Sequence, residues 1–415
     1  MSAYFDDKET QFHKKRAEEQ NRRLSEMIRK GYAKSQRVRE MCDERNLMPS
    51  DIMTTSDLEK LPVISRDKLI EWELKEPPYG GFSCADLKTD RIFTSPGPVY
   101  EPHLGEKDRL WARGYHAAGF GETDTVINTF SYHMVAAGLT FHEGLRAVGA
   151  TVIPSGTSST EHQVQLINHL GVTGYTGTPS FLKAIINKAE ELGYDLKRDL
   201  SLRRASFVAE PLEKSLRQLF EEKYGIDTYQ MYGATEVGDI AYECREKKGW
   251  HICEDVIVEI ADPETGINVA PGSLGEVVVT RLNSMFFLFR FGTGDLSKII
   301  IDECPCGRTS YRLDGIAGRV GDAVKVRGMF IAPSQLKNIK EYFTEIKYQL
   351  VVTRESHRDC ISAIIESDDD KQDLINRFKD IFKAICTVKL DSCEIVKRGD
   401  ISESDALIVD KRTWE

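Results

Sequence analysis

The sequence lacks the features of a membrane protein, a secreted protein or a nucleic-acid-binding protein. No run of about 18 apolar residues occurs, which excludes a transmembrane helix. The first residues carry no basic segment followed by an apolar stretch, as a secretory signal would. Nine cysteines are too few for a disulfide scaffold, and a net charge of −10 disfavours binding to phosphate backbones. We therefore expect a cytoplasmic protein that binds neither membranes nor nucleic acids.

The sequence does contain a regular alternation of strand-like and helix-like segments between about residues 90 and 240. Short apolar runs, for example at 125–130, 172–177 and 204–209, are separated by longer amphipathic stretches. This alternation predicts an α/β fold with a doubly wound parallel sheet. Such sheets bind ligands beyond the carboxyl ends of their strands.

The rest of the chain predicts two further parts. Residues from about 244 to 317 are rich in β-branched residues and turn signals, which indicates a β-rich subdomain of a large N-terminal domain, 1–317. Residues 318–415 have their own order of strand, helix, two strands, helix and strand. They predict a small C-terminal α+β domain that follows a glycine-containing linker.

Three cysteines and one histidine have the chemistry of a metal site. Cys244 and His251 lie in one segment, and Cys304 and Cys306 lie in a later one. Three thiolates and one imidazole suit tetrahedral structural zinc. Because the spacing is not that of a common zinc finger, buried reduced thiols remain the alternative, and Cys253 is a spare candidate ligand.

Several motifs follow one another in a fixed order. These are Met231-Tyr-Gly-Ala-Thr-Glu236, Arg290-Phe-Gly-Thr-Gly-Asp295, Gly318-Arg319 and Lys325-Val-Arg-Gly328. Together they resemble the adenylate-forming acyl-CoA ligases. Phe207-Val-Ala-Glu-Pro211, Ala332-Pro-Ser-Gln335 and the two cysteine segments are similar to the phenylacetate–CoA ligase branch. The resemblance runs from about residue 60 to 412 and implies the adenylate-forming fold, the Cys/His zinc set and frequent homodimers.

The resemblance also implies roles for individual residues. Tyr232 would stack on an adenine ring, Thr235 would bond a phosphate and Glu236 would hold Mg²⁺. Asp295 would accept the ribose hydroxyls, for which a carboxylate has enough lone pairs, and Arg319 would contact ribose or phosphate. Gly321 would be the domain hinge, and the loop 325–330 would line a pantetheine tunnel. The remaining residues implied to bind nucleotide or CoA are Ala209, Glu210, Pro211, Gly233, Ala234, Lys325, Arg327 and Gly328.

The segment from Phe130 to Gly138 resembles the substrate-pocket motif of the same ligases. The resemblance makes His133 the candidate residue for orienting the acyl carbonyl or for deprotonating a thiol. An imidazole suits the second role because its ordinary pKa is close to neutral pH. The alternative is that His133 is a buried histidine whose hydrogen bonds are made within the core and which has no catalytic role. Tyr132, Gly138 and Tyr175 are the candidate residues of the acyl pocket.

The chain departs from the family at its phosphate loop. The family has a Ser/Thr/Gly-rich loop ending in Gly-Lys-Pro, which holds phosphate with backbone N–H groups and a lysine. Here the aligned stretch is Thr94-Ser-Pro-Gly-Pro-Val-Tyr-Glu-Pro-His103. Two of its substitutions are prolines that remove N–H donors, and Glu101 replaces the lysine. A carboxylate facing a triphosphate is repulsive.

A second departure lies near the C-terminus. The family carries a lysine that stabilises charge during adenylation, in a Ser-Glu-Gly-Lys type of segment. Here Ser402-Glu403 match, but Ser404 or Asp405 stands at the lysine position, and Lys411 is several residues displaced. Loss of such a cation costs orders of magnitude in rate. The alternative is a looser alignment in which another lysine serves.

These features favour acyl transfer without ATP. An aryl or short acyl group would pass from its CoA thioester to the phosphopantetheine thiol of an acyl carrier protein, as anthranilate does in specialised members of the branch. The first alternative is an ATP- and Mg²⁺-dependent aryl-carboxylate–CoA ligase with unusual loops. A non-catalytic binding protein of the same fold is the second alternative.

Overall fold

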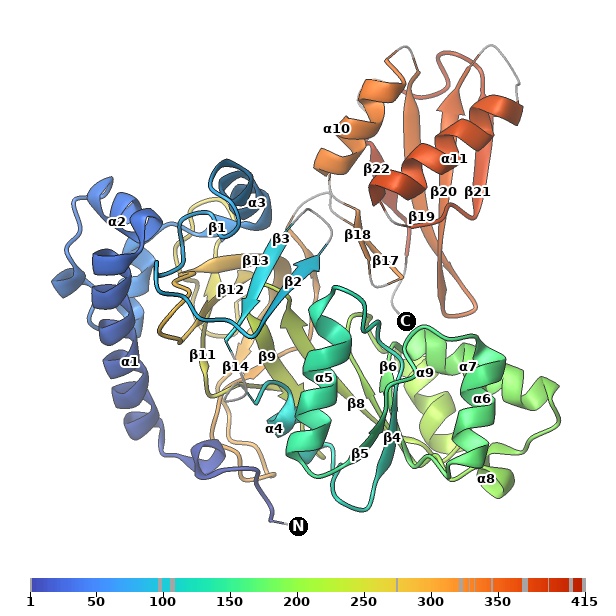
Figure 1. Ribbon diagram of the computed structural model, residues 1–415, viewed down its shortest axis with the longest axis horizontal. Coiled ribbons are helices and arrows are strands. Elements are labelled where there is room, and N and C mark those ends of the chain that lie inside the picture. The colour runs from blue at the N-terminus through green and yellow to red at the C-terminus, as the bar shows by residue number, and fades with distance from the viewer. Residues whose placement is uncertain are drawn as a thin grey trace. The chain divides into compact units, whose positions relative to one another are not determined.

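The computed structural model describes residues 2–95, 99–104, 109–273, 275–320, 324–327, 329–331, 333–344, 346–367, 372–386, 388–402 and 406–412. The chain divides into two compact units, shown in Figure 1. The first contains Met1–Pro211 and Leu219–Val320, and the second contains Leu212–Gln218 and Gly321–Glu415.

A nine-stranded mixed sheet forms the centre of the first unit, in the order β14-β15-β10-β9-β8-β7-β6-β4-β5. Strands β4 to β8 pair in parallel, and the others extend the sheet antiparallel from β8. The parallel strands are β4 (Thr125–Asn128), β5 (Thr151–Ile153), β6 (Gly174–Gly177), β7 (Arg204–Phe207) and β8 (Asp227–Ala234). The antiparallel ones are β9 (Gly238–Glu243), β10 (Trp250–Ile252), β14 (Ile299–Ile300) and β15 (Arg312–Leu313).

Helices connect the parallel strands, as the alternation in the sequence predicts (Figure 1). They are α5 (Ala136–Ala147), α6 (Thr160–His169), α7 (Pro179–Glu191), α8 (Leu196–Asp199) and α9 (Lys214–Gln218), which a π-helical turn, η4 (Leu219–Lys223), continues, whereas α4 (Ala112–Ala117) precedes β4. The start of α7 shows why these ends are fixed: Thr178 caps the Phe181 N–H, and Pro179 lies in the first turn, where no amide donor is needed. Every residue of β6 is buried, as expected for a strand covered on both faces.

A second sheet lies in the same unit, in the order β1-β13-β12-β11, with β16 on β13. Its strands are β1 (Ile64–Ser65), β11 (Val256–Ala261), β12 (Gly275–Arg281), β13 (Phe291–Ser297) and β16 (Gly318–Arg319). The predicted β-rich stretch, 244–317, is thus shared between the two sheets. Because β16 pairs with β13, residues 318 and 319 belong to the first unit, and the unit ends three residues later than the sequence suggested.

The N-terminal helices pack against this second sheet. Leu24, Met27 and Ile28 form the buried face of α1 and share a core with Phe287 and Phe289. The helical segments are η1 (Asp7–Thr10), α1 (His13–Lys34), α2 (Gln36–Asp43), η2 (Pro49–Asp51), η3 (Thr55–Lys60) and α3 (Arg66–Lys75). A separate hairpin, β2 (Arg91–Ser95) with β3 (Val99–His103), contains the stretch aligned with the phosphate loop.

The second unit is an α+β sandwich with its own core. A four-stranded sheet in the order β21-β20-β19-β22 packs against two helices around Phe378 and Phe382. The elements are β17 (Val324–Val326), β18 (Met329–Ile331), α10 (Pro333–Tyr342), β19 (Tyr348–Glu355), β20 (Arg358–Glu366), α11 (Gln372–Cys386), β21 (Ser392–Val396) and β22 (Ile408–Asp410). Strands β17 and β18 form a separate hairpin.

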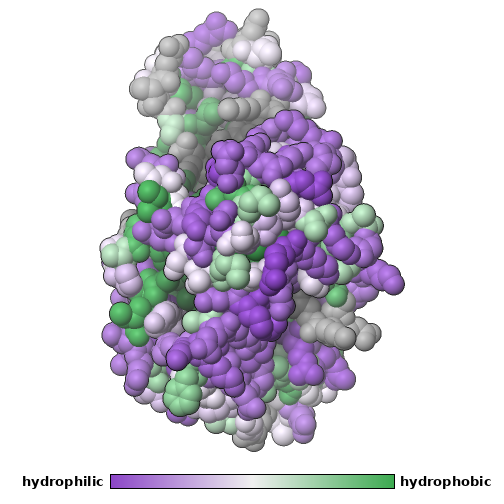
Figure 2. Space-filling view, turned by 90° about the vertical axis from the view of Figure 1, so that its left-hand side faces the viewer, coloured by the Kyte–Doolittle hydropathy of each residue, from purple (hydrophilic) through white to green (hydrophobic). Residues whose placement is uncertain are grey.

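The described surface is mostly polar, as the content of charged residues in the sequence suggests. The side of the molecule that carries α1 and α2 is largely hydrophilic, with apolar residues in small groups (Figure 2). No described helix combines the length and the hydropathy that spanning a bilayer requires.

Candidate functional site

Three residues implied to bind nucleotide come together next to the end of β8. The Tyr232 hydroxyl donates to Asp295 Oδ2 at 2.8 Å, and Arg319 Nε lies 3.1 Å from Asp295 Oδ1. Asp295 and Arg319 face each other across the β13–β16 pair. Three motifs that are distant in the sequence therefore form one polar constellation, with a flat ring beside a fixed carboxylate.

The surroundings of Tyr232 keep its phenol protonated. The ring is buried and packs on Trp250, with ring centroids 5.7 Å apart. Burial and the charge of Asp295 raise the pKa of Tyr232 well above its usual value. Burial lowers the pKa of Arg319, whereas Asp295 opposes that shift. The carboxylate of Asp295 thus keeps a charged partner and a neutral one.

The other predicted nucleotide residues lie around the ends of β7 and β8. Thr235 is exposed in the turn after β8. Gly233 is required by packing, because a Cβ there would lie 2.4 Å from both the Gly238 carbonyl oxygen and the Trp111 ring. Ala209 has a φ of 76°, a strained value for a residue with a side chain. Ala234 is half-buried, Glu210 lies 3.4 Å from the Ser180 N–H, and Pro211 is exposed.

A buried acidic cluster, consisting of Glu73, Glu101 and Glu236 with Arg66, lies beside this constellation. Arg66 Nε is 3.1 Å from Glu236 Oε1, and the Glu236 side chain is only 1% exposed. Glu101 accepts a hydrogen bond from Ser95 Oγ at 3.1 Å, and Glu73 accepts one from the Tyr100 N–H at 2.9 Å. Within the described part of the chain, Glu101 Oε2 and Glu73 Oε1 have no hydrogen-bond donor, and the ion pair with Arg66 is the contact that Glu236 has.

The cluster holds more negative charge than its single arginine can neutralise. Burial, followed by the nearby Glu236 charge, raises the pKa of Glu101 well above its usual value. Burial also raises the pKa of Glu73, to about 7, although the hydrogen bond from Tyr100 opposes this. At neutral pH the cluster therefore retains a proton.

This shift predicts a pH-dependent effect of Glu73→Gln. A carboxyl whose pKa is raised on folding stabilises the protein fully below its unfolded pKa of about 4.5, and that stability is lost as the pH rises through about 7. Since the introduced amide would need no proton and would still accept the Tyr100 N–H, the variant should melt a few degrees above wild type at pH 8. The two melting temperatures should agree more closely at pH 5, as measured by differential scanning calorimetry. A difference that does not change with pH would contradict the assignment.

Two backbone N–H groups beside the turn of the β2–β3 hairpin already have hydrogen-bond acceptors within the protein. The Thr94 N–H donates to the Met134 carbonyl at 2.9 Å, and the Tyr100 N–H donates to Glu73. Pro96, Gly97 and Pro98 lie outside the described residues. The described part of the hairpin thus offers a carboxylate where a phosphate loop offers N–H groups and a lysine.

The acyl-pocket candidates lie after β4 and on β6. Asn128 Nδ2 donates to the Tyr132 hydroxyl at 2.8 Å, and Gly138 permits a close turn because a Cβ there would lie 2.3 Å from the Ser131 carbonyl oxygen. Tyr175 is fully buried, with its hydroxyl 3.0 Å from the Thr178 carbonyl. The His133 side chain is exposed.

Four residues that shape the site could not be predicted from the sequence motifs. Arg66 and Glu73 lie on α3, outside the motifs, and only their ion pair and hydrogen bond reveal them. Asn128 and His142 flank Tyr132 in space. Of these four residues, Asn128 alone had a sequence signal that could have marked it as a site residue, because it is a polar residue at the end of a buried strand.

The predicted zinc ligands converge. Cys244, His251, Cys304 and Cys306 are all buried, and their ligand atoms lie within 4.8 Å of one another. Cys306 Sγ is 3.3 Å from His251 Nε2, whereas His251 Nδ1 lies 3.2 Å from the Ser310 carbonyl oxygen. That second contact leaves Nε2 to face the sulfurs, the arrangement typical of a metal-bound histidine. The donor set, its burial and its convergence therefore fit zinc.

The N-terminal segment packs over the loop that contains Cys304 and Cys306. Arg308 Nε donates to buried Glu9 at 2.6 Å, the Arg308 N–H donates to Cys306 Sγ, and the Tyr4 hydroxyl donates to the Cys306 carbonyl. Cys253 takes no part in this group, because its thiol contacts Asp239 at 3.5 Å.

The predicted residues of the second unit are only partly described. Lys325 lies in β17, whereas Gly321, Gly328, Glu403, Ser404 and Asp405 lie outside the described residues. Arg327 ion-pairs with Asp391 and donates to the Asp359 carbonyl at 3.0 Å. Its guanidinium therefore stabilises the second unit.

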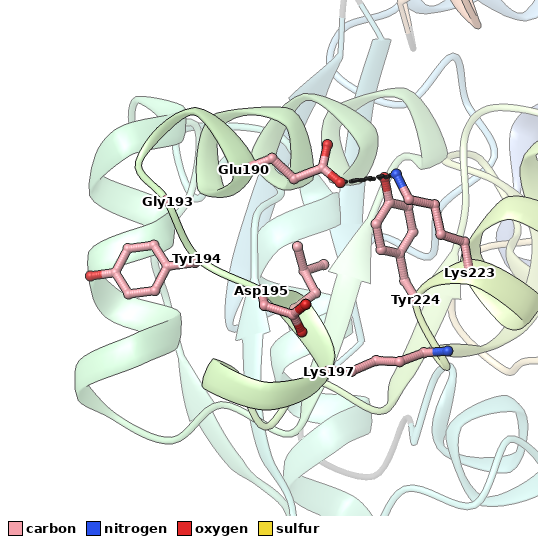
Figure 3. Close-up of a pocket in the computed structure, with 8 residues that line it drawn as sticks. Glu190, Gly193, Tyr194, Asp195, Lys197, Lys223 and Tyr224 are labelled. Atoms are coloured by element: carbon pink, nitrogen blue, oxygen red, sulfur yellow. Dashed lines mark hydrogen bonds and ion pairs between the residues drawn. The ribbon is translucent and has the colours of Figure 1, made fainter.

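A pocket of about 280 Å³ lies elsewhere, lined by Glu190, Gly193, Tyr194, Asp195, Leu196, Lys197, Lys223 and Tyr224. Lys223 and Tyr224 both point toward Glu190 and bond it at 3.0 Å, whereas Tyr194 points away (Figure 3). Residues 190–197 lie at the C-terminal end of α7 and in the turn into α8, and Lys223 and Tyr224 precede β8, so the pocket is at the amino-end edge of the parallel strands. Ligands of such sheets bind at the opposite edge, so we assign this pocket no function.

Comparison with known proteins agrees with this geometry. Residues 108–286 match the family model described as AMP-binding enzyme. The chain is 31% identical to the phenylacetate–coenzyme A ligase of Escherichia coli over 84% of this chain and 81% of that protein. It is 29% identical to the Thermus thermophilus enzyme of the same name over 84% and 80%.

A solved structure of 2-hydroxyisobutyryl-CoA ligase shares the fold. It superposes with a TM-score of 0.90 over 99% of this chain and 93% of that one, at 22% identity. The fold is therefore that of the adenylate-forming enzymes, as the motifs suggested. Together with the sequence identity to the bacterial ligases, this establishes that the chain belongs to the phenylacetate–coenzyme A ligase family of AMP-binding enzymes.

Proposed function

We propose that this protein moves an aryl or short acyl group from its CoA thioester to the phosphopantetheine thiol of an acyl carrier protein, without forming an acyl-adenylate. The observation that carries the proposal is the position of Glu101. Its carboxyl group is buried in the hairpin aligned with the phosphate loop, beside Glu236 and Glu73.

This arrangement opposes the binding of a triphosphate in two ways. A nucleotide tail would meet buried carboxyl groups where related loops offer a lysine, so it would lose the attraction of a cation, which is worth about 4 kcal/mol at close range near a protein surface. Glu236, the residue implied to hold Mg²⁺, is already paired with Arg66. The segment 402–405 also lacks the lysine that adenylation needs.

The retained residues suit a CoA thioester. Tyr232, Asp295 and Arg319 would hold the adenosine of CoA instead of that of ATP. Exchange of one thioester for another needs little chemical activation, so proximity and a positioned base supply most of the rate.

The test compares transfer with adenylation in the full-length protein. Anthraniloyl-CoA and benzoyl-CoA are offered with pantetheine or a phosphopantetheinylated carrier protein, and thioester products are followed by mass spectrometry. In parallel, ATP–pyrophosphate exchange is measured with the free acids. We expect transfer without exchange. Robust exchange, with no ATP-independent transfer, would refute the proposal.

The second candidate is an ATP-dependent aryl-carboxylate–CoA ligase. The names of the relatives that are 31% identical favour it, as do the retained Thr235, Glu236, Asp295 and Arg319. It predicts the opposite outcome of the same test: exchange dependent on Mg²⁺ and a CoA product that requires ATP.

We also propose that Cys244, His251, Cys304 and Cys306 hold a structural zinc ion. The set already supplies four protein ligands, which is typical of structural zinc, whereas catalytic zinc keeps one position open for water or substrate. The metal would fix the loop between β14 and β15 against β10.

A further inference from the structure

Tyr132 and His142 lie in hydrogen-bond contact beyond the carboxyl end of β4. Tyr132 lies in the loop that follows the strand, and His142 lies on α5. The Tyr132 hydroxyl is 3.1 Å from His142 Nδ1, and the two rings meet edge to face at 5.9 Å. The pair thus occupies the edge of the sheet at which parallel α/β folds bind ligands.

Asn128 fixes the orientation of this pair. Its side chain is fully buried, and its Oδ1 accepts the Phe130 N–H at 3.1 Å. Its Nδ2 must then be the donor, both to the Tyr132 hydroxyl at 2.8 Å and to the Gly138 carbonyl at 2.9 Å. One lone pair of the Tyr132 oxygen is therefore always occupied.

The remaining hydrogen-bonding capacity of the pair matches what a thioester exchange needs. When His142 carries its proton on Nδ1, it donates to the second lone pair of Tyr132, and the Tyr132 O–H is left to donate elsewhere. The imidazole lone pair is then on Nε2, since the hydrogen bond that the His142 ring makes to a described residue is the one from Nδ1 to Tyr132.

The ionisation states of both groups are compatible with this role. Burial lowers the pKa of His142, and the Arg146 charge adds to this while Glu143 opposes it. Burial raises the pKa of Tyr132 to about 12, against the hydrogen bond from Asn128. At neutral pH the pair therefore consists of a neutral imidazole and a protonated phenol.

We propose that His142 is the base for the acceptor thiol and that Tyr132 is the hydrogen-bond donor to the acyl carbonyl. This inference rests on the proposed transferase function and assigns its catalytic residues. His142 Nε2 takes the S–H proton, and the thiolate sulfur bonds to the carbonyl carbon. Tyr132 stabilises the negative oxygen of the tetrahedral intermediate. The C–S bond to CoA then breaks, its electron pair stays on the CoA sulfur, and His142 returns the proton there.

The decisive variant is His142→Asn. Asparagine can keep a hydrogen bond to Tyr132 but cannot accept a proton. We expect kcat for transfer from benzoyl-CoA to pantetheine to fall at least about a hundredfold, with KM within about threefold of wild type. In wild type, kcat/KM should decline at acidic pH with a midpoint below 6.5, because the pKa of His142 is lowered. That decline should be absent in the variant.

Two other substitutions complete the set. Tyr132→Phe should lower kcat by about a hundredfold, the usual cost of losing one donor to a developing oxyanion. His169→Asn, at an exposed position on α6, is the matched control and should leave transfer unchanged. A large loss in His133→Ala together with near-normal His142→Asn would assign the base to His133 and overturn the inference.

Failure of the proposed function can be separated from failure of this inference. If wild type transfers no acyl group, the function is refuted. The same variants are then assayed for attack of CoA on a synthetic benzoyl-adenylate, which also requires a thiol base. Unchanged rates in His142→Asn would refute the catalytic pair, and a hundredfold loss would support it.

Discussion

Glu101→Lys should give the protein an affinity for ATP·Mg²⁺ at least about a hundredfold above that of wild type. The substitution replaces a buried carboxyl group with a cation in the hairpin aligned with the phosphate loop. Two charges 4 Å apart interact by about 4 kcal/mol near a protein surface, so the introduced cation by itself exceeds the roughly 2.7 kcal/mol that a hundredfold change requires. Glu73 and Glu236 would stabilise the introduced ammonium group. Isothermal titration calorimetry measures the effect.

Two control variants show whether a change in ATP affinity comes from the position of the substitution or from the change of charge alone. Glu122→Lys makes the same change of charge at an exposed residue and should not alter ATP affinity. Glu101→Gln adds no cation at a carboxyl group whose pKa burial already raises, so it should bind ATP no more tightly than wild type. Micromolar binding of ATP by wild type, unaffected by Glu101→Lys, would show that the cluster does not govern triphosphate binding. It would also favour the ligase function.

Cys306→Ser should remove nearly all bound zinc and lower the melting temperature by at least about 10 °C. Serine keeps the size of the side chain but is a poor zinc ligand, and the loss would leave two thiols and an imidazole buried without their metal. The effect should spread to the N-terminus, because Glu9 and Tyr4 are held by Arg308 and the Cys306 carbonyl. Metal analysis, calorimetry and limited proteolysis near residues 4–16 measure these three consequences.

Cys360→Ser is the matched control for the metal site. Cys360 is a half-buried thiol in β20 of the second unit, outside the metal-ligand group. The Cys360→Ser variant should retain one zinc ion per chain and have the melting temperature of wild type. Purified wild-type protein without zinc, with the stability of Cys306→Ser, would contradict a structural metal.

The order of elements could be predicted because it depends on local patterns. The apolar runs at 125–130, 172–177 and 204–209 place β4, β6 and β7 to within about two residues, since each strand buries faces set by its own pattern. The pairing of the β-rich stretch could not be predicted. Which strands of 244–317 join which sheet depends on partners such as β1, which pairs with β13 from far away in the chain.

The family motifs, the four candidate zinc ligands and the substitution of lysine by Glu101 could be read from the sequence, because these are matters of residue type at a position. The packing of Glu73 and Arg66 around Glu101 and Glu236, and of Asn128 and His142 against Tyr132, became visible in the folded chain. The physical reason is that burial and charge proximity arise when separate helices and strands pack together. No spacing along the chain specifies them.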